Sequence, residues 1–88
     1  MKLSDPSAKA DLLRRVRRIE GQSRGVAKMI DEDRDCSEIL QQLAAVRSAA
    51  HKATIALVRA YATECCSTPQ ASTEEIAEAL ATALSRLA

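Results

Sequence analysis

Residues 35–66 read DCSEILQQLAAVRSAAHKATIALVRAYATECC, and this stretch decides the fold. Apolar or small residues recur in it at steps of three and four, and neither Gly nor Pro interrupts it. This spacing predicts one continuous α-helix with a cysteine at each end. The apolar stripe comprises Cys36, Ile39, Leu40, Leu43, Val46, Ala50, Ala53, Leu57, Val58 and Tyr61.

Two of the three cysteines in this stretch, Cys36 and Cys65, lie on one face of the helix but far apart along it. Cys36 and Cys65 fall within about 20° of the same face and roughly 43 Å apart along the axis. One copy of the helix therefore cannot bring them together. If two copies pair antiparallel, Cys36 of each copy lies beside Cys65 of the partner subunit, twice by symmetry.

Composition points to a small helical oligomer. The chain has 88 residues, and we interpret residues 1–88 as a single domain. Alanine supplies 17 residues and Tyr61 is the one aromatic residue, so each buried side chain removes little area from water. A monomer would have a thin core, and we expect an obligate oligomer. The absence of a long apolar run and of a signal peptide predicts a cytoplasmic protein with no membrane partner.

The rest of the chain predicts two more helices. Asp5 and Pro6 form a helix start, and the first long helix is expected to run to about Asp31. Its expected apolar seam consists of Leu12, Val16, Ile19, Ser23, Val26 and Ile30. Gly21 and Gly25 lower the helix propensity by about 1 kcal/mol each relative to Ala. We interpret them as a place of close helix contact, with a kink as the alternative.

Capping signals separate the helices. Asp33 or Asp35 would cap the second helix, and residues 72–75 (STEE) read as a capping box that opens a short third helix. No strand pattern or internal repeat occurs. The sequence therefore predicts an all-α fold of three helices, two long and antiparallel and one short.

Charge is distributed unevenly. The net charge is only +1, but residues 1–30 carry eight Lys/Arg against three acids, whereas residues 31–88 are net acidic. Four arginines fall within five positions, near only Asp11 and Glu20. A solvated helix face would explain such a cluster, but a phosphate backbone supplies the missing counter-charge. Without interleaved aromatic residues or helix-turn-helix spacing, we expect contacts to duplex DNA. The cluster comprises Arg14, Arg15, Arg17 and Arg18.

Three other residues have side chains capable of chemistry. Tyr61 lies one helical turn from Cys65, so it would line the same site, while Cys66 is turned by about 100°. His51 lies in the middle of the helix and is expected on its polar face. The chain has one His, no Gly-rich loop and no paired carboxylates in an apolar setting, so we do not expect an enzyme.

The residues RRVRRIEGQSRGVAKMIDEDRDCSEILQQLAAVRSAA, 14–50, closely resemble the signature region of the copper-sensitive operon repressors (the CsoR/RcnR family). The resemblance extends from about Leu12 to Cys65. It implies an antiparallel four-helix-bundle dimer that assembles into a homotetramer. It also implies a repressor that binds double-stranded operator DNA and releases it when an inducer occupies the site between protomers. By the same resemblance, the DNA-contact candidates are Arg15, Arg18, Arg47 and Lys52.

The resemblance also bears on the inducer. Copper-sensing members have Cys, His and Cys at the positions of Cys36, Tyr61 and Cys65, and nickel or cobalt sensors use further histidines that this chain lacks. Two thiols without the His are similar to the persulfide-sensing branch, in which a sulfur bridge links the protomers. We therefore expect persulfide or polysulfide to crosslink Cys36 and Cys65, with Tyr61 and Cys66 lining the site and no resident cofactor.

Two other functions stay open at this point. A Cu(I)-sensing repressor could use the same two thiolates, because thiolates are ligands that Cu(I) prefers. A helical adaptor that binds other proteins would belong to a different class, and the absence of specific DNA binding would favour it.

Overall fold

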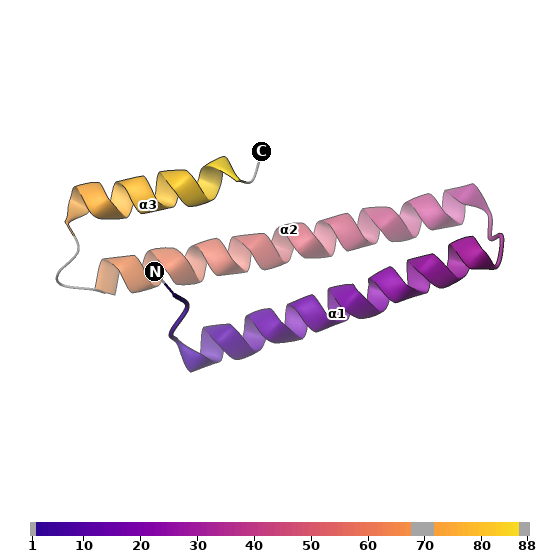
Figure 1. The fold of residues 1–88 in the computed structure, drawn as a ribbon, viewed down its shortest axis with the longest axis horizontal. Coiled ribbons are helices and arrows are strands. Elements are labelled where there is room, and N and C mark those ends of the chain that lie inside the picture. The colour runs from indigo at the N-terminus through magenta and orange to yellow at the C-terminus, as the bar shows by residue number, and fades with distance from the viewer. Residues whose placement is uncertain (1, 68–71, 87–88) are drawn as a thin grey trace.

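The chain folds into three α-helices, α1 (Pro6–Asp31), α2 (Cys36–Ser67) and α3 (Thr73–Ser85). This computed structural model describes the backbone of residues 2–67 and 72–86 and the side chains of residues 2–64 and 72–86, and no strand occurs in them. α1 and α2 run antiparallel side by side, and α3 returns along the other side of α2 (Figure 1). The prediction of an all-α fold with two long helices and one short helix is confirmed.

The helices begin where the capping signals predict. The Asp5 carboxylate accepts a hydrogen bond from the Ser7 N–H at 3.2 Å, and Pro6 occupies the first turn, where no intrahelical N–H bond is needed. At the start of α3, the Ser72 hydroxyl accepts from the Glu75 N–H at 3.1 Å. Each cap satisfies a backbone donor that the helix itself leaves without a partner.

In the turn between α1 and α2, the two candidate N-cap residues, Asp33 and Asp35, have different roles. Asp35 caps α2, because its carboxylate accepts from both the backbone N–H, at 3.2 Å, and the hydroxyl of Ser37. These bonds, the hydroxyl first, lower the pKa of the Asp35 carboxyl below its ordinary value. Asp33 instead adopts a left-handed φ of 56°, a conformation that Asp tolerates better than most residues.

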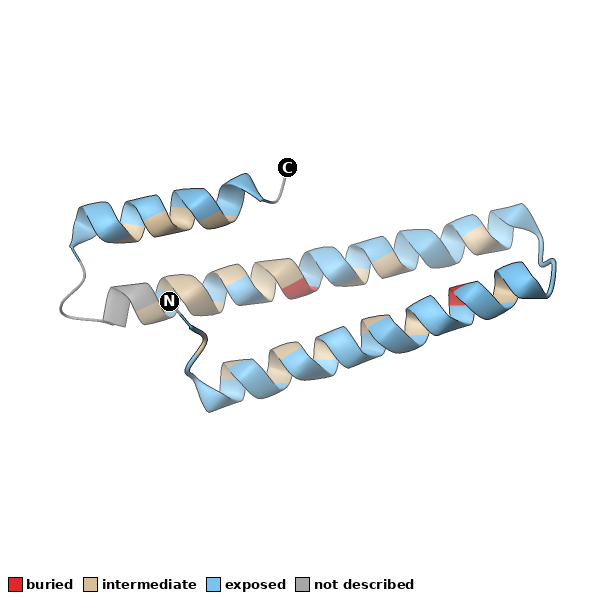
Figure 2. Cartoon of the chain, viewed as in Figure 1, coloured by how far each residue is buried: buried red, intermediate tan, exposed pale blue. Residues whose placement is uncertain are grey.

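The three helices form a single layer. The molecule measures 55 × 26 × 13 Å, and the smallest extent is close to the diameter of one helix, about 10–12 Å. Among the described residues, only Val26 and Ala53 are buried (Figure 2). The chain exposes 6799 Å², whereas a folded monomer of 9.5 kDa exposes about 5,000 Å². One layer of helices cannot enclose a core, so apolar faces stay open.

The face of α1 that contacts α2 differs from the predicted seam. Three predicted residues are buried or half-buried: Leu12, Ile19 and Val26. The prediction is wrong for Val16, Ser23 and Ile30, which are exposed, Val16 at 43% and Ile30 at 56%. The positions half-buried in their place are each one residue before an exposed seam residue. They are Arg15, Gln22 and Met29. The small alanines of α2 leave room for these long side chains, and the aliphatic stem of an arginine can be buried while its charged end reaches water.

The two glycines of α1 do not mark a close contact within the chain. A Cβ atom added at Gly25 would meet nothing within 4 Å, and one at Gly21 would meet only Arg24 Nη2, at 3.9 Å. α1 also continues through both positions without a break. The predicted close helix contact is therefore not observed within the chain, and the alternative, a kink, does not interrupt the helix.

α2 carries two apolar stripes, where the sequence pattern suggested one. The first faces α1 and consists of Ile39, Val46, Ala49 and Ala53, which are half-buried or buried. The second, which we call the open stripe, consists of Cys36, Leu40, Leu43 and Leu57. Leu40, Leu43 and Leu57 are 65%, 46% and 40% exposed. Leu57 lies beside α3 and is still 40% exposed, while Leu40 and Leu43 are not covered by any described part of the chain.

Candidate functional site

The two cysteines predicted to sense the inducer, Cys36 and Cys65, belong to opposite ends of α2. Cys36 is the first residue of the helix, and its thiol is free and exposed. The helix continues without interruption to Ser67, so Cys65 is roughly 43 Å away along the axis. The prediction that one chain cannot join these two cysteines is confirmed. The side chains of Cys65 and Cys66 lie outside the described residues.

Tyr61 lines a groove of about 720 Å³ between α2 and α3. Its residue is half-buried, and the α2 wall beside it continues with Val58, Leu57 and Thr54. α3 supplies a wall of mixed character, consisting of Glu75, Glu78, Ala79, Thr82, Ala83 and Arg86. An apolar groove of this kind, next to the predicted position of Cys65, is a place where another element can pack.

The start of α1 is held against the end of α2 that carries Cys65. Glu64 Oε1 accepts hydrogen bonds from the backbone N–H groups of Ser4 and Asp5, both at 2.9 Å. These bonds, led by that of Asp5, lower the pKa of the Glu64 carboxyl. The sequence does not predict this contact, because nothing in it indicates which acid meets a backbone about 60 residues away. The carboxylate ties the basic helix directly to the neighbourhood of Cys65.

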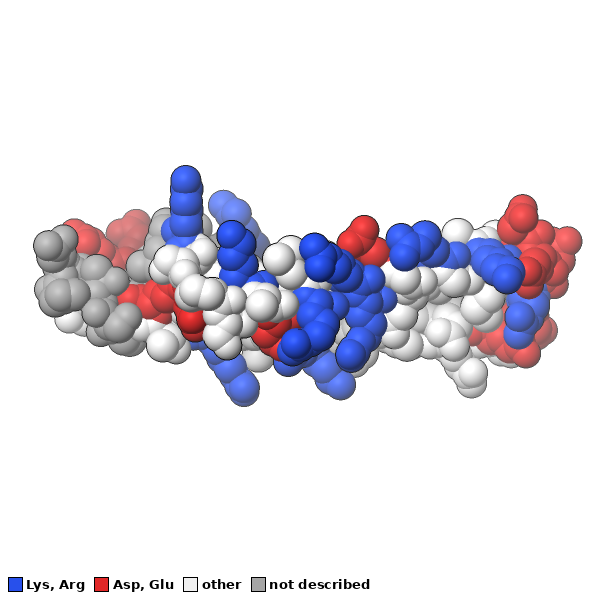
Figure 3. All heavy atoms as spheres, turned by 90° about the horizontal axis from the view of Figure 1, so that it is seen from below, with Lys and Arg blue, Asp and Glu red and all other residues white. Residues whose placement is uncertain are grey.

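Three of the four DNA-contact candidates lie together. Arg15, Arg18 and Lys52 line a groove of about 300 Å³ between α1 and α2, which we call the basic groove. Gln22 also lines it, and its Oε1 is buried without a hydrogen-bond partner in the described part of the chain. Gln22 was not predicted as part of a site. The available signal was its spacing, three residues after Ile19 and four before Val26, which places it next to the α1 seam. Figure 3 shows Lys and Arg gathered over the middle of the α1 side and acids clustered at one end.

Arg47 lies apart from the basic groove. It lines a shallow concavity of about 640 Å³ along the open stripe, with Leu40, Leu43 and His51. The five-residue separation between Arg47 and Lys52 rotates the two side chains by about 140° around the helix. His51 is exposed, but it lies beside Leu40 and Leu43 along the open stripe, so the prediction that it lies on the polar face of the helix is wrong.

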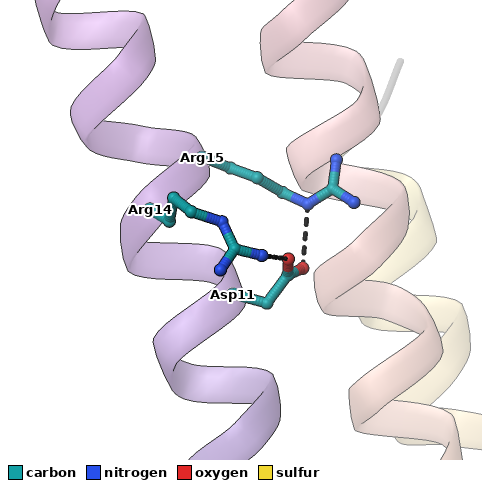
Figure 4. Close-up of polar contacts among 3 residues, drawn as sticks. All are labelled: Asp11, Arg14 and Arg15. Atoms are coloured by element: carbon teal, nitrogen blue, oxygen red, sulfur yellow. Dashed lines mark hydrogen bonds and ion pairs between the residues drawn. The ribbon is translucent and has the colours of Figure 1, made fainter.

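The Asp11 carboxylate forms ion pairs with two of the four clustered arginines. Asp11 accepts from Arg14 Nη2 at 2.5 Å and from Arg15 Nε at 2.9 Å (Figure 4). The hydrogen bond from Arg15, followed by the positive charges of both arginines, lowers the pKa of the Asp11 carboxyl. The Arg15 side chain extends from α1 toward α2, so this pair lies at the edge of the basic groove.

A metal site within one chain is not indicated. Among the side chains that the structure describes, no group of three or more His, Cys, Asp or Glu residues is close enough to hold an ion. A site that two chains share would not be visible in one of them. In the same residues, no helix is both long and apolar enough to cross a membrane.

The chain is similar in sequence to known regulators of transcription. The family model described as metal-sensitive transcriptional repressor matches residues 8–86. The chain is 40% identical over 57 residues to the copper-sensing transcriptional repressor RicR of Mycobacterium tuberculosis (strain ATCC 25618 / H37Rv), which is 65% of this chain and 59% of that protein. It is 39% identical over 57 residues to the copper-sensing transcriptional repressor CsoR of Bacillus subtilis (strain 168), 65% of this chain and 56% of the relative.

A solved structure extends the likeness to the whole fold. The nickel-responsive transcriptional regulator InrS superposes with a TM-score of 0.81 at 31% sequence identity, over 100% of this chain and 98% of that chain. The two curated relatives are matched over less than two thirds of their own length. All three similar proteins are named as regulators of transcription. From the match over residues 8–86 and this superposition, we conclude that the chain belongs to the metal-sensitive transcriptional repressor family.

Proposed function

We propose that this protein is a Cu(I)-responsive transcriptional repressor. It binds duplex DNA through the basic groove, and Cu(I) is held by Cys36 of one copy and Cys65 of the partner subunit. The observation that carries the proposal is the exposed Cys36 thiol at one end of a continuous 32-residue helix that has Cys65 near its other end. The two curated relatives, both named as copper-sensing repressors, support the choice of metal over sulfur.

Antiparallel pairing of two α2 helices accounts for the open stripe. If Cys36 lies beside Cys65 of the partner subunit, equal helical rise brings Leu40 beside Tyr61 and Leu43 beside Val58 of the partner subunit. Tyr61 and Val58 line the α2–α3 groove, while Leu40 and Leu43 are exposed in the single chain. Each copy therefore offers exposed leucines to a groove of the other.

The accessible surface supports such an assembly. The chain exposes 6799 Å², which exceeds the surface of a compact monomer of this mass by about 1,700 Å². An obligate interface buries about 2,000 Å² or more in total, roughly half from each partner. The excess is larger than the roughly 1,000 Å² that one such interface takes from each partner, so it is compatible with at least one obligate contact per chain.

Two thiolates suit the proposed ion. Cu(I) is a soft cation that prefers thiolate ligands, and two thiolates from different copies would make the bound ion a link between them. Tyr61 would line this site but is a poor ligand for a soft metal. Glu64, one residue before Cys65, anchors the backbone at the start of α1. A change at the shared site would therefore reach the basic helix through a direct contact.

DNA binding is assigned to the positive charge between α1 and α2. Arg15, Arg18 and Lys52 converge on one groove, where phosphate oxygens would supply the counter-charge. Arg guanidinium groups match phosphate geometry with paired donors. Arg47 faces another part of the molecule, so we assign it a smaller share of the contact.

Sulfur bridging is the second candidate, and Tyr61 favours it. A thiolate of one copy would attack the inner sulfur of a persulfide on the other, forming a Cys36–Cys65 disulfide and releasing hydrosulfide. This chemistry needs only the two facing thiols, whereas a metal ion gains from a third soft ligand that Tyr61 does not provide.

One experiment separates these candidates. Reduced protein is bound, without oxygen, to an operator fragment selected by the protein itself from random duplex DNA. It is then titrated either with Cu(I) buffered by a chelator or with inorganic polysulfide. We expect Cu(I) to bind stoichiometrically and release the DNA, and Cys36→Ser and Cys65→Ser to abolish release while Cys66→Ser, the matched control, does not. Release by polysulfide alone, with a covalent dimer in the intact mass, would replace Cu(I) with the sulfur bridge.

A further inference from the structure

The most strongly charged cluster outside the proposed thiol site contains an acid among four arginines. The Asp11 carboxylate takes one hydrogen bond from Arg14 and one from Arg15 (Figure 4). Both pairs lie within one helix, at three and four residues' separation. Arg15 also lines the basic groove, whereas Arg14 is not part of its wall. The carboxylate therefore holds a guanidinium that the proposed DNA contact requires.

The ion pairs are placed where they contribute little to folding. The side chains of Arg14, Arg15 and Asp11 are 68%, 41% and 35% exposed, and pairs this accessible to water and salt stabilise a fold only weakly. Their effect on an approaching polyanion is larger, because the carboxylate cancels one positive charge at the edge of the groove. It also occupies Arg15 Nε, one of the donors in the fork that binds a phosphate with two hydrogen bonds.

We propose that Asp11 is an internal counter-charge that competes with DNA phosphate for Arg15 and so lowers the affinity of this protein for duplex DNA. The inference rests on the proposed DNA binding through the basic groove. Binding to phosphate exchanges the Arg15–Asp11 hydrogen bond for an Arg15–phosphate bond and leaves the carboxylate near the DNA. Non-specific DNA binds almost only through its phosphates. A loss of phosphate affinity therefore removes a larger fraction of its total binding free energy than it does for specific DNA. Asp11 is thus a residue that sets affinity and specificity.

The other acid near the cluster offers a matched control. Glu20 lies on the same helix, two residues from Arg18, and makes no ion pair with the described residues. Glu20→Gln and Asp11→Asn remove the same charge from α1 with a nearly isosteric amide. A difference between the two variants therefore reports the release of a specific guanidinium and not the change in net charge.

The test measures binding of the full-length protein to a short fluorescein-labelled duplex of mixed sequence, by anisotropy over a series of salt concentrations. We expect Asp11→Asn to bind about five- to tenfold more tightly at 0.1 M salt and to steepen the slope of log K against log salt by about one. Glu20→Gln should change the affinity less than twofold. In an Arg15→Ala background, Asp11→Asn should lose most of its effect, because the guanidinium that it frees is gone.

The outcomes distinguish the inference from the function on which it rests. If the wild-type protein binds the duplex with a normal salt dependence and Asp11→Asn binds equally or more weakly, Asp11 positions Arg15 for DNA and the proposal is wrong. If the wild-type protein shows no salt-dependent binding to the mixed duplex or to its selected operator, the DNA-binding function fails as well. Helix content by circular dichroism, with Asp11→Ala as a second variant, separates either result from misfolding.

Discussion

The two sides of α2 differ in which apolar residues they expose, because the leucines are exposed and a small alanine is the most buried residue. The side that faces α1 places Ala49 and Ala53 beside Ile39 and Val46, and Ala53, at 7% exposed, is its most buried residue. The open stripe carries three leucines, and the most exposed, Leu40, keeps 65% of its surface accessible. Large apolar residues are normally the ones that a fold buries. On α2 the three leucines are instead the residues left exposed.

This difference separates two functions of an apolar face. Alanine lets α1 and α2 approach closely and favours helix, but each methyl group removes little area from water. Leucine would contribute more than alanine to stability, yet the hydrophobic area of Leu40, Leu43 and Leu57 becomes useful only when a second molecule covers it. The pairing of α1 with α2 therefore shapes the chain, while the association that we propose would provide much of its stability.

The largest effect is expected from a charge on the open stripe. Leu40→Glu should dissociate the oligomer, because it replaces a leucine whose burial is worth roughly 2–3 kcal/mol and does so twice in a symmetric dimer. Sedimentation velocity should show a monomer, and the melting temperature should fall with it. Gln41→Glu adds the same charge at the next position of α2, where the residue is also exposed, and should leave the oligomer intact. An unchanged sedimentation coefficient for Leu40→Glu would show that the open stripe is not the interface.

A smaller effect is expected on the covered side. Ala53→Leu forces three carbon atoms into the contact with α1, and overpacking of this kind costs about 1–3 kcal/mol. Urea unfolding at constant protein concentration should show a lower midpoint. Ala10→Leu, at an exposed position of α1, provides the control for the change in residue type. Equal stability of the two variants would mean that α1 and α2 are less tightly packed than the low exposure of Ala53 indicates.

The smallest effect tests the outer face of α1. Gly25→Ala should raise the free energy of unfolding by up to about 1 kcal/mol, because Ala favours helix and the added Cβ meets nothing within 4 Å. Thermal unfolding followed by circular dichroism measures the change. A loss of stability, or a lower oligomeric state in sedimentation velocity, would instead indicate that another copy packs against this glycine, as the prediction of close helix contact would require across an interface.

Local signals predicted the helices well because their causes are local. Asp5, Pro6 and Ser72 cap or open helices through hydrogen bonds and backbone preferences that depend on adjacent residues. The continuous helix from Cys36 follows from the spacing of its apolar residues and the absence of Gly and Pro. Apolar spacing did not decide which face of α1 contacts α2. Arg15 and Val16 lie on either side of the row formed by Leu12 and Ile19, and either could have been the buried neighbour.

The sequence by itself determined that this chain is three helices, that its positive charge lies in the first, and that Cys36 and Cys65 are too far apart on one helix to meet. These results follow from helical geometry and from the order of the residues. Only the tertiary structure decided that Arg15, Arg18 and Lys52 share a groove, that Glu64 holds the start of α1, and that the leucines of α2 stay exposed. Which face of one helix packs on another depends on how whole side chains interlock, and residue spacing along a single helix does not contain that information.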